Sequence, residues 1–361
     1  MVCAMRQLQE KCKKQNIGLY TVFVDLTKAF DTVSRPGLWI LLQKAGCPPR
    51  IVSMIKAFNS GMTGRVFEGG EYSEPFEITN GAKQGCVLAP TLFGIIFAFM
   101  LRYAFNNLDK GIYLQVRSDG KVFNIRRFSA RTKLSEMLIR DFLFADDCAL
   151  SAHSLEDLQI ITNRFADAAT KFGLTISLKK TEVLYQPPPG QPHSNPVLTI
   201  AGTELNSVKS FCYLGSVMSH DTSLDAEITS RIAKASAAFG SLSRRLWRNH
   251  GIKLSTKIKV YNAVVISSLL YASSTWTLYR RQVQQLESFH MKCLRRTCGI
   301  TWQLRIPNTE VLEKCQTTGI ETYIYRNQLR WAGHLVRMDE GRIPKALFYS
   351  QLKERKNEKI E

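Results

Sequence analysis

The sequence lacks an apolar run long enough to cross a membrane. Its longest, residues 91–101, is too short to span a bilayer and predicts a buried helix instead. We also expect no secretory leader, because residues 1–5 run straight into the polar residues 6–10. We therefore expect no membrane partner and an intracellular location, nuclear or cytoplasmic.

Signatures of structural zinc and of nucleophilic hydrolases are scarce too. Cys293 and Cys298 are separated by four residues, but Cys315 and His334 lie too far along the chain to complete a typical zinc motif. The nine cysteines are an odd, scattered set, which argues against a complete disulfide framework and favours free thiols in a reducing compartment. The chain has no G-x-S-x-G motif, and its six histidines stand in no recognisable triad context.

Acidic residues are fewer than basic residues. The 361 residues include 49 Lys and Arg against 30 Asp and Glu, which gives a net charge of +19 and an isoelectric point near 9.6. Thirteen of the basic residues fall between Arg231 and Thr301 with one acid, Glu287, so this segment alone carries +12. Such clustering indicates a polyanionic partner, most simply nucleic acid, although a merely solvated basic surface is the alternative.

The remaining composition, 45% hydrophobic and 22% charged, is typical of a folded chain with two or more subdomains. Hydrophobic periodicity predicts helices over the first eighteen residues, near 39–45 and 49–59, from 90, after Ser154, from 223, and over 255–272 and 280–297. Turn signals predict hairpins over 64–78 and 112–126, and five prolines make 186–196 a loop or boundary.

Two strand-like apolar runs each carry acidic residues. Residues 19–24 lead into Asp25, and residues 141–150 hold the adjacent pair Asp146 and Asp147. Burying such charges is costly unless counter-charge compensates them, and divalent metal ions are the obvious compensation. Two strands that deliver Asp to one place would make a site for two Mg²⁺ ions, which phosphoryl or nucleotidyl transfer requires.

Five motifs surround these acids in a fixed order, at residues 25–31, 80–90, 144–147, 172–181 and 211–216. In this order they resemble the palm motifs of reverse transcriptases, most closely those of non-LTR (LINE-type) retrotransposons. Phe-Ala-Asp-Asp stands where the family usually has Tyr or Phe before Ala-Asp-Asp. Residues 330–338 also resemble the tail of such polymerases, so the resemblance covers nearly the whole chain.

The resemblance implies attack of a primer 3′-hydroxyl on the α-phosphate of a nucleotide, with two Mg²⁺ (or Mn²⁺) ions as cofactors. Asp25 and Asp146 would be the shared metal ligands, and Asp147 would assist from the hairpin turn. Lys180 would donate a proton to pyrophosphate, although a lysine that follows Lys179 could equally be a solvated charge.

The resemblance also assigns substrate contacts. Phe30 would lie under the sugar and exclude a 2′-hydroxyl; its alternative is a core aromatic. Gln84 and Gly85 would form the floor beneath the templating base pair, Gly85 because a side chain there would block close approach. The primer grip would be the hairpin that includes Tyr213, Leu214 and Gly215.

The implied fold is α+β: a polymerase right-hand palm, in which helices pack on an antiparallel sheet, followed by an α-helical thumb. We expect an N-terminal helical remnant at 1–18, the palm at 19–185, a loop and primer-grip hairpin at 186–222, a basic thumb at 223–300 and a tail region at 301–361. The thumb would contact the phosphate backbone of an RNA–DNA hybrid. Trp247, Trp276 and Tyr279 could stack on bases, although helical spacing favours core packing.

The sequence departs from the family pattern before its first acid. Twenty-four residues precede Asp25, and none of them resembles the fingers hairpin that clamps the nucleotide triphosphate, or an endonuclease. We therefore expect a truncated reading frame that covers palm, thumb and tail.

Two functions follow from this pattern. One is an RNA-directed DNA polymerase of retrotransposon origin, whose partners are an RNA template, a DNA primer, dNTP and an element RNA ribonucleoprotein. The alternative is a truncated, catalytically impaired remnant that binds nucleic acid only.

Overall fold

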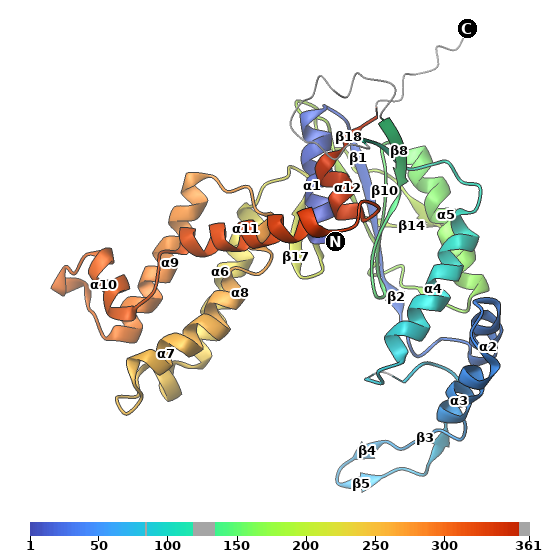
Figure 1. Ribbon diagram of the computed structural model, residues 1–361, viewed down its shortest axis with the longest axis horizontal. Coiled ribbons are helices and arrows are strands. Elements are labelled where there is room, and N and C mark those ends of the chain that lie inside the picture. The colour runs from blue at the N-terminus through green and yellow to red at the C-terminus, as the bar shows by residue number, and fades with distance from the viewer. Residues whose placement is uncertain (84, 118–133, 354–361) are drawn as a thin grey trace. The chain divides into compact units, whose positions relative to one another are not determined.

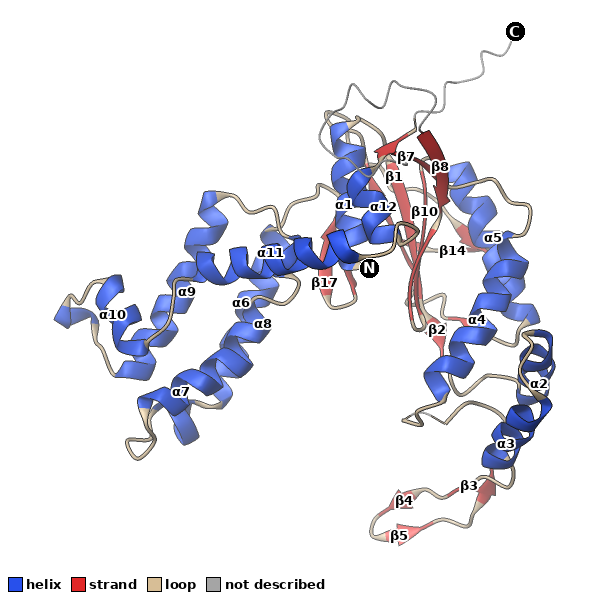
Figure 2. Cartoon of the chain, in the orientation of Figure 1, coloured by secondary structure: helices blue, strands red, loops and turns tan. Residues whose placement is uncertain are grey.

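A computed structural model describes residues 1–83, 85–117 and 134–353 (Figure 1). The chain forms two compact units. The sheet unit consists of residues 17–113 and 138–208, and the helical unit consists of residues 1–16, 114–137 and 209–361. Both helices and strands are present, which confirms the expected α+β class (Figure 2). Within the described ranges, no helix has the length and apolar character that a membrane span needs.

The sheet unit is built on a five-stranded sheet with the order β15-β12-β1-β10-β9. These strands are Asn206–Val208, Glu182–Gln186, Leu19–Val24, Asp147–Ala152 and Asp141–Phe144. The β12–β15 pair is parallel and the other pairs are antiparallel. Because side chains alternate between the two faces of a strand, Val22 and Val24 of β1 share one face with Cys148 and Leu150 of β10.

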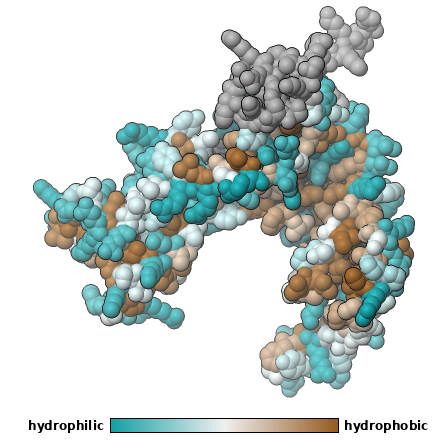
Figure 3. Space-filling view, in the orientation of Figure 1, coloured by the Kyte–Doolittle hydropathy of each residue, from teal (hydrophilic) through white to brown (hydrophobic). Residues whose placement is uncertain are grey.

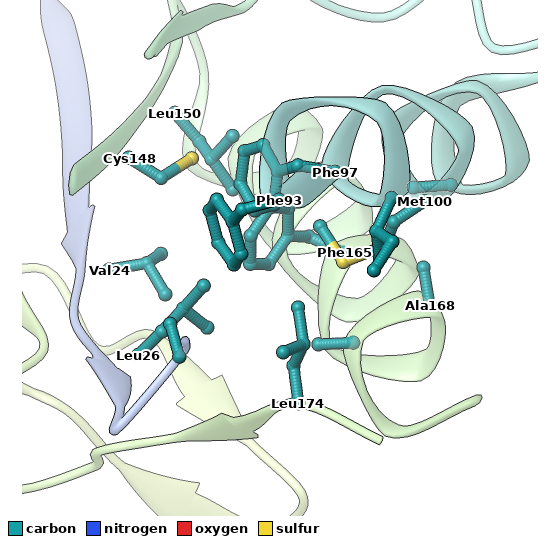
Figure 4. Close-up of a cluster of buried hydrophobic side chains, with 14 of the residues drawn as sticks. Val24, Leu26, Phe93, Phe97, Met100, Cys148, Leu150, Phe165, Ala168 and Leu174 are labelled. Carbon is teal, nitrogen blue, oxygen red and sulfur yellow. The ribbon is translucent and has the colours of Figure 1, made fainter. Parts of the chain in front are cut away.

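Two helices, α4 (Ala89–Phe105) and α5 (Leu155–Lys171), pack on that face of the sheet (Figure 1). The N-cap residue Ser154 explains where α5 begins, because its side chain accepts a hydrogen bond from the backbone N–H of Asp157 at 3.1 Å. The resulting core brings Phe93, Phe97 and Phe165 together above the sheet (Figure 4). Burying one such aromatic side chain contributes about 2 to 3 kcal/mol, so the core holds β1 and β10 in register.

Smaller elements complete the sheet unit. They are α2 (Arg35–Lys44), α3 (Pro49–Asn59), and the strand pairs β2 (Leu26–Thr27) with β11 (Thr175–Ile176), β3 (Thr63–Gly64) with β6 (Phe76–Glu77), β4 (Phe67–Glu68) with β5 (Glu71–Tyr72), and β13 (Thr199–Ile200) with β14 (Thr203–Glu204). The β3–β6 arm confirms the hairpin expected over 64–78, and its tip mixes hydrophobic with hydrophilic side chains (Figure 3). The turn of the second expected hairpin, at 118–120, lies outside the described residues.

The helical unit combines a hairpin with a set of helices. Its elements are α1 (Val2–Lys14), β16 (Ser210–Tyr213), β17 (Ser216–Ser219), α6 (Asp225–Ser241), α7 (Leu254–Val260), α8 (Ser267–Leu269), α9 (Arg280–Cys298), α10 (Asn308–Cys315), α11 (Ile320–Arg337) and α12 (Ile343–Tyr349). Strand β18 (Gln351–Leu352) pairs with Leu114 and Gln115 of β7 (Ile112–Arg117), which neighbours β8 (Leu134–Ile139). The helix expected over 255–272 is interrupted, because π-helical turns at Tyr261–Ile266 separate α7 from α8.

Aromatic side chains form the centre of the helical unit. Trp247 stacks on Phe239 with ring centroids 4.8 Å apart, and both meet Tyr261 edge-on. Trp247 and Trp276 are buried, whereas Tyr279 is 68% exposed. Core packing is therefore confirmed for the two tryptophans.

Candidate active site

The adjacent acids lie at the tight turn between β9 and β10. Phe144 pairs with Asp147, so only Ala145 and Asp146 form the loop, and Ala145 takes a left-handed φ of 54°. Asp146 thus occupies the turn and Asp147 begins β10. The expectation that Asp147 lies in the turn was wrong by one residue, because strand pairing resumes directly after Asp146.

Asp25 follows β1 on the neighbouring strand. Val24, the last residue of β1, pairs with Cys148 of β10, so Asp25 and Asp147 each directly adjoin the last residue pair of this ladder. Outside the ladder, the Asp25 backbone N–H donates to Thr181 Oγ1 at 3.3 Å, and its carbonyl accepts from the Ser177 N–H at 2.8 Å. The segment that carries Lys180 is thereby fixed to Asp25.

The surroundings of Asp147 disfavour its charged form. Burial, and then the charges of Asp146 and Asp25, raise the pKa of Asp147. Lys180 Nζ lies 3.7 Å from Asp25 Oδ2, and these side chains are 74% and 40% exposed. The hard carboxylate oxygens suit Mg²⁺ chemically. Among the described residues, however, no three acidic, His or Cys side chains are gathered closely enough to form a ready metal cage.

The polar loop after residue 79 docks on the segment that contains Phe30. The Ala82 N–H donates to Phe30 O and the Gly81 N–H donates to Val33 O, both at 2.8 Å. The Phe30 ring is half-buried and stacks on Phe93 with centroids 4.5 Å apart, so it is partly a core aromatic. Two of the expected substrate-contact motifs therefore lie side by side in the sheet unit.

Of the two residues expected beneath the base pair, Gln84 lies outside the described residues. Gly85 has a φ of 83°, and a side chain there would meet no neighbouring protein atom within 4 Å. A glycine suits this position because L-residues rarely adopt that backbone conformation.

Sequence reasoning missed Arg35, which holds the docked loop in place. This arginine is buried, and its guanidinium donates to the carbonyls of Gly81 at 3.0 Å, Asn59 at 2.8 Å and Ile78 at 2.7 Å. These carbonyls belong to the last residue of α3 and to the segment after β6, which are distant in sequence, so no local pattern predicts the role of Arg35.

The hairpin expected to be a primer grip is a tight turn in the helical unit. Tyr213 pairs with Ser216, so Leu214 and Gly215 form a two-residue loop with φ values of 49° and 76°. Left-handed φ at both positions is typical of a type I′ turn, which usually uses Asn or Gly rather than Leu. Tyr271 Oη donates to Leu214 O at 2.9 Å, which fixes the unusual residue.

A buried charge cluster supports this hairpin from behind. Glu227 accepts from the Val217 N–H at 2.6 Å and from Arg231 Nε at 2.9 Å, and Arg231 also donates to Gly215 O. Arg6 of α1 donates to Ser216 Oγ at 3.0 Å and to Val217 O at 3.1 Å. Burial lowers the pKa of Arg6, an effect that the charge of Glu227 opposes.

The basic segment that begins at Arg231 remains mostly accessible. Arg231 and Lys257 are buried, and Arg295 is half-buried. The ten exposed cations are Lys234, Arg244, Arg245, Arg248, Lys253, Lys259, Arg280, Arg281, Lys292 and Arg296. Most of the charge that suggested a polyanionic partner is therefore on the surface.

Comparison with known families decides the relationship. The family described as reverse transcriptase (RNA-dependent DNA polymerase) matches residues 2–218, well over half of the chain. The chain belongs to the reverse transcriptase family. The five ordered motifs between residues 25 and 216 fall within the matched range, and relatives from non-LTR elements confirm the LINE-type resemblance.

Relatives among mobile elements agree with this placement. An RNA-directed DNA polymerase from the mobile element jockey of Drosophila funebris is 26% identical over 306 residues, which cover 82% of this chain and 30% of the relative. A Pol polyprotein of the type-1 retrotransposable element R2 of Bradysia coprophila is 27% identical over 182 residues, which cover 50% and 18%. The alignment thus spans less than a third of either relative.

Solved structures of telomerase are also similar. Apo telomerase from Candida tropicalis aligns with a TM-score of 0.41 and 12% identity, covering 97% of this chain and 56% of that one. Telomerase from Candida albicans in complex with a fragment of telomeric RNA aligns with a TM-score of 0.38 and 12% identity, covering 90% and 50%.

Proposed function

We propose that this chain is an RNA-directed DNA polymerase of LINE-type retrotransposon origin, which extends a DNA 3′-hydroxyl on an RNA template. The observation that carries the proposal is the placement of the three acids: Asp25 directly follows β1, and Asp146 and Asp147 lie at the turn into β10, the strand that pairs with β1. Membership of the reverse transcriptase family supports it.

In this proposal Asp25, Asp146 and Asp147 hold two Mg²⁺ (or Mn²⁺) ions through their carboxylate oxygens. When bound, the ions activate the primer hydroxyl and neutralise the leaving pyrophosphate. Lys180 donates a proton to pyrophosphate. Its largely exposed side chain can turn from Asp25 toward a phosphate.

The remaining roles concern binding of the RNA template, the DNA primer and dNTP, within an element RNA ribonucleoprotein. The residues assigned to them are Phe30 at the sugar, Gln84 and Gly85 at the templating base pair, and Tyr213, Leu214 and Gly215 at the primer end. Residues 223–300 act as a thumb on the hybrid, and their exposed cations support this assignment because phosphate contacts are electrostatic.

Primer extension on an RNA template with Mg²⁺ or Mn²⁺ tests the proposal. Asp146→Asn should lower the rate by about 100-fold or more, because charge stabilisation of the transition state is lost. Asp109→Asn removes an exposed carboxylate of the same unit and should leave the rate unchanged. Equal product from the wild type and Asp146→Asn would reject the site assignment.

The ten exposed cations also favour a second candidate, a remnant that binds nucleic acid without catalysis. It predicts salt-sensitive binding of an RNA–DNA hybrid and no incorporation at any metal concentration. Extension by the wild-type chain that depends on Asp146 would exclude it.

A further inference from the structure

A groove beside α11 is not used by the proposed polymerase site. It has a volume of about 520 Å³ and lies entirely within the helical unit. Its lining consists of Leu270, Ala272, Ser273, Ser274, Asn327, Arg330, Trp331, His334 and Arg337. We propose that this α11 groove binds the phosphodiester backbone of a single-stranded nucleic acid. The inference rests on the proposed function only in taking nucleic acid as the partner.

The groove is preformed by contacts between α11 and the short 3₁₀ helix Ser273–Thr275. Asn327 Nδ2 donates to Ser273 Oγ at 3.0 Å, and Gln328 Nε2 donates to Trp276 O at 2.9 Å. Ala272, at the edge of the groove, takes a left-handed φ of 60°. These contacts already fix the positions of α11 and the 3₁₀ helix that line the groove. A ligand would therefore lose little free energy in ordering these two elements when it binds.

The charge of the groove has one sign. None of its nine lining residues is acidic, whereas two are arginines and one is a histidine. Arg330 and Arg337 are exposed, and within the described part of the chain neither of them forms an ion pair. The Arg337 guanidinium folds back along the helix, where Nη1 would lie 3.4 Å from a Cβ placed on Gly333. Both cations are therefore available to an anionic ligand.

The groove also contains an aromatic surface. The half-buried Trp331 donates from Nε1 to Cys3 Sγ at 3.0 Å, which fixes the plane of its ring. The His334 ring lies beside it, with centroids 5.4 Å apart. Nucleobases stack on such rings without sequence preference, so the groove can contact the base as well as the phosphate.

The combination of two cations with an aromatic surface favours a strand over a single anion. Arg330 and Arg337 are seven residues apart on α11, which separates their Cα atoms by about 10 Å along the helix axis. A single phosphate could meet both guanidinium groups, but it would leave the Trp331 and His334 rings of the groove without a ligand to contact. A chain of phosphates with adjoining bases satisfies both arginines and the ring pair together.

Fluorescence anisotropy with labelled 12-nucleotide single-stranded RNA and DNA, in EDTA and over a salt series, tests the inference. Arg330→Gln/Arg337→Gln should weaken binding several-fold and reduce the slope of log K against log salt by about 1.4 for two lost phosphate contacts. Arg330→Lys/Arg337→Lys should restore most of the slope. The matched control Arg50→Gln/Lys56→Gln removes two exposed charges from α3 and should change the slope by much less. If the groove variant and the control variant lost equal binding affinity and equal salt slope, the inference would be overturned.

Photocrosslinking gives a second, independent measurement. An RNA that contains 4-thiouridine or a DNA that contains 4-thiothymidine should form an adduct within the α11 groove, at Trp331 or a neighbour. The probe that gives the higher adduct yield shows whether the groove prefers RNA or DNA. No adduct in the groove from either strand would reject the proposal. Displacement of the strand by tripolyphosphate at equal phosphate concentration would also reject it, because the groove would then select charge alone.

These outcomes separate the groove from the polymerase. Binding is measured without metal, so inactivity in primer extension leaves the groove assignment standing. Conversely, normal extension by the wild type combined with unchanged binding by Arg330→Gln/Arg337→Gln rejects the groove alone.

Discussion

Replacing Glu227 with methionine should destabilise the helical unit far more than removal of an ordinary surface acid. The Glu227 side chain is fully buried and is the only acidic group that ion-pairs with Arg231 within the described residues. Its removal leaves Arg231 without its charge partner and the Val217 N–H without its acceptor. Breaking a buried ion pair on one side costs about 3 to 5 kcal/mol, a large part of the 5 to 15 kcal/mol that typically stabilises a domain.

The chain offers a matched control in Asp167→Asn. Asp167 pairs with Lys171 at 3.0 Å with the same four-residue helical spacing, but these side chains are 57% and 53% exposed. An exposed pair of this kind contributes only about 0.5 kcal/mol. Because the two ion pairs have the same spacing, a difference in the stability lost by the two variants measures the effect of burial.

Hydrogen exchange at the Val217 amide and guanidinium unfolding would measure the effect. Glu227→Met should speed hydrogen exchange in the β16–β17 hairpin and lower the guanidinium concentration at the midpoint of unfolding. Asp167→Asn should change neither quantity appreciably. The double variant Glu227→Met/Arg231→Met should recover part of the loss, because neither charge then remains buried alone. A cost below about 1 kcal/mol for Glu227→Met, or strictly additive single variants, would refute the argument.

Three further outcomes are expected. Burial lowers the pKa of His290 from 6.5 to about 4 in the folded protein. As the pH falls, the imidazole of the unfolded chain is therefore protonated before that of the folded chain. About 3 kcal/mol of folding stability, fully present above pH 6.5, is lost as the pH falls toward 4. A pH series of unfolding curves for His290→Gln should be flatter than that for the exposed His250→Gln. Gly81→Ala should destabilise the fold more than Gly46→Ala in thermal melts, because both glycines have positive φ but only the Cβ at residue 81 would lie 2.8 Å from Asp31 O. Phe30→Val should admit rNTP in primer extension if the ring excludes the 2′-hydroxyl, and unchanged discrimination would leave Phe30 as a core residue only.

Local signals in the sequence were enough to predict much of the fold. The cap at Ser154 and the spacing of Leu158, Ile161 and Phe165 correctly placed α5, and the Gly69-Gly70 turn correctly placed the hairpin arm. The π-helical turns at Tyr261–Ile266 were not predicted, because apolar periodicity does not distinguish a regular helix from a locally widened one.

The candidate site was predicted only in part, for a different physical reason. Order and residue type identified Asp25, Asp146 and Asp147, because acids at the ends of apolar strands stand out locally. Arg35 gave no such signal. Its partners include three backbone carbonyls, groups that every residue possesses, so only the three-dimensional arrangement reveals the contacts.

The first helix of the chain has a consequence for biosynthesis. α1 packs its buried residues, among them Leu8, into a unit whose other parts follow residue 113, and Lys11 donates to Ser350 O near the far end. At typical translation rates of about 5 to 20 residues per second, some tens of seconds separate the emergence of these two partners from the ribosome. Until Ser216 and Val217, which Arg6 contacts, have emerged, the apolar side of α1 lacks these native partners, which makes this helix of the nascent chain a natural client for chaperones.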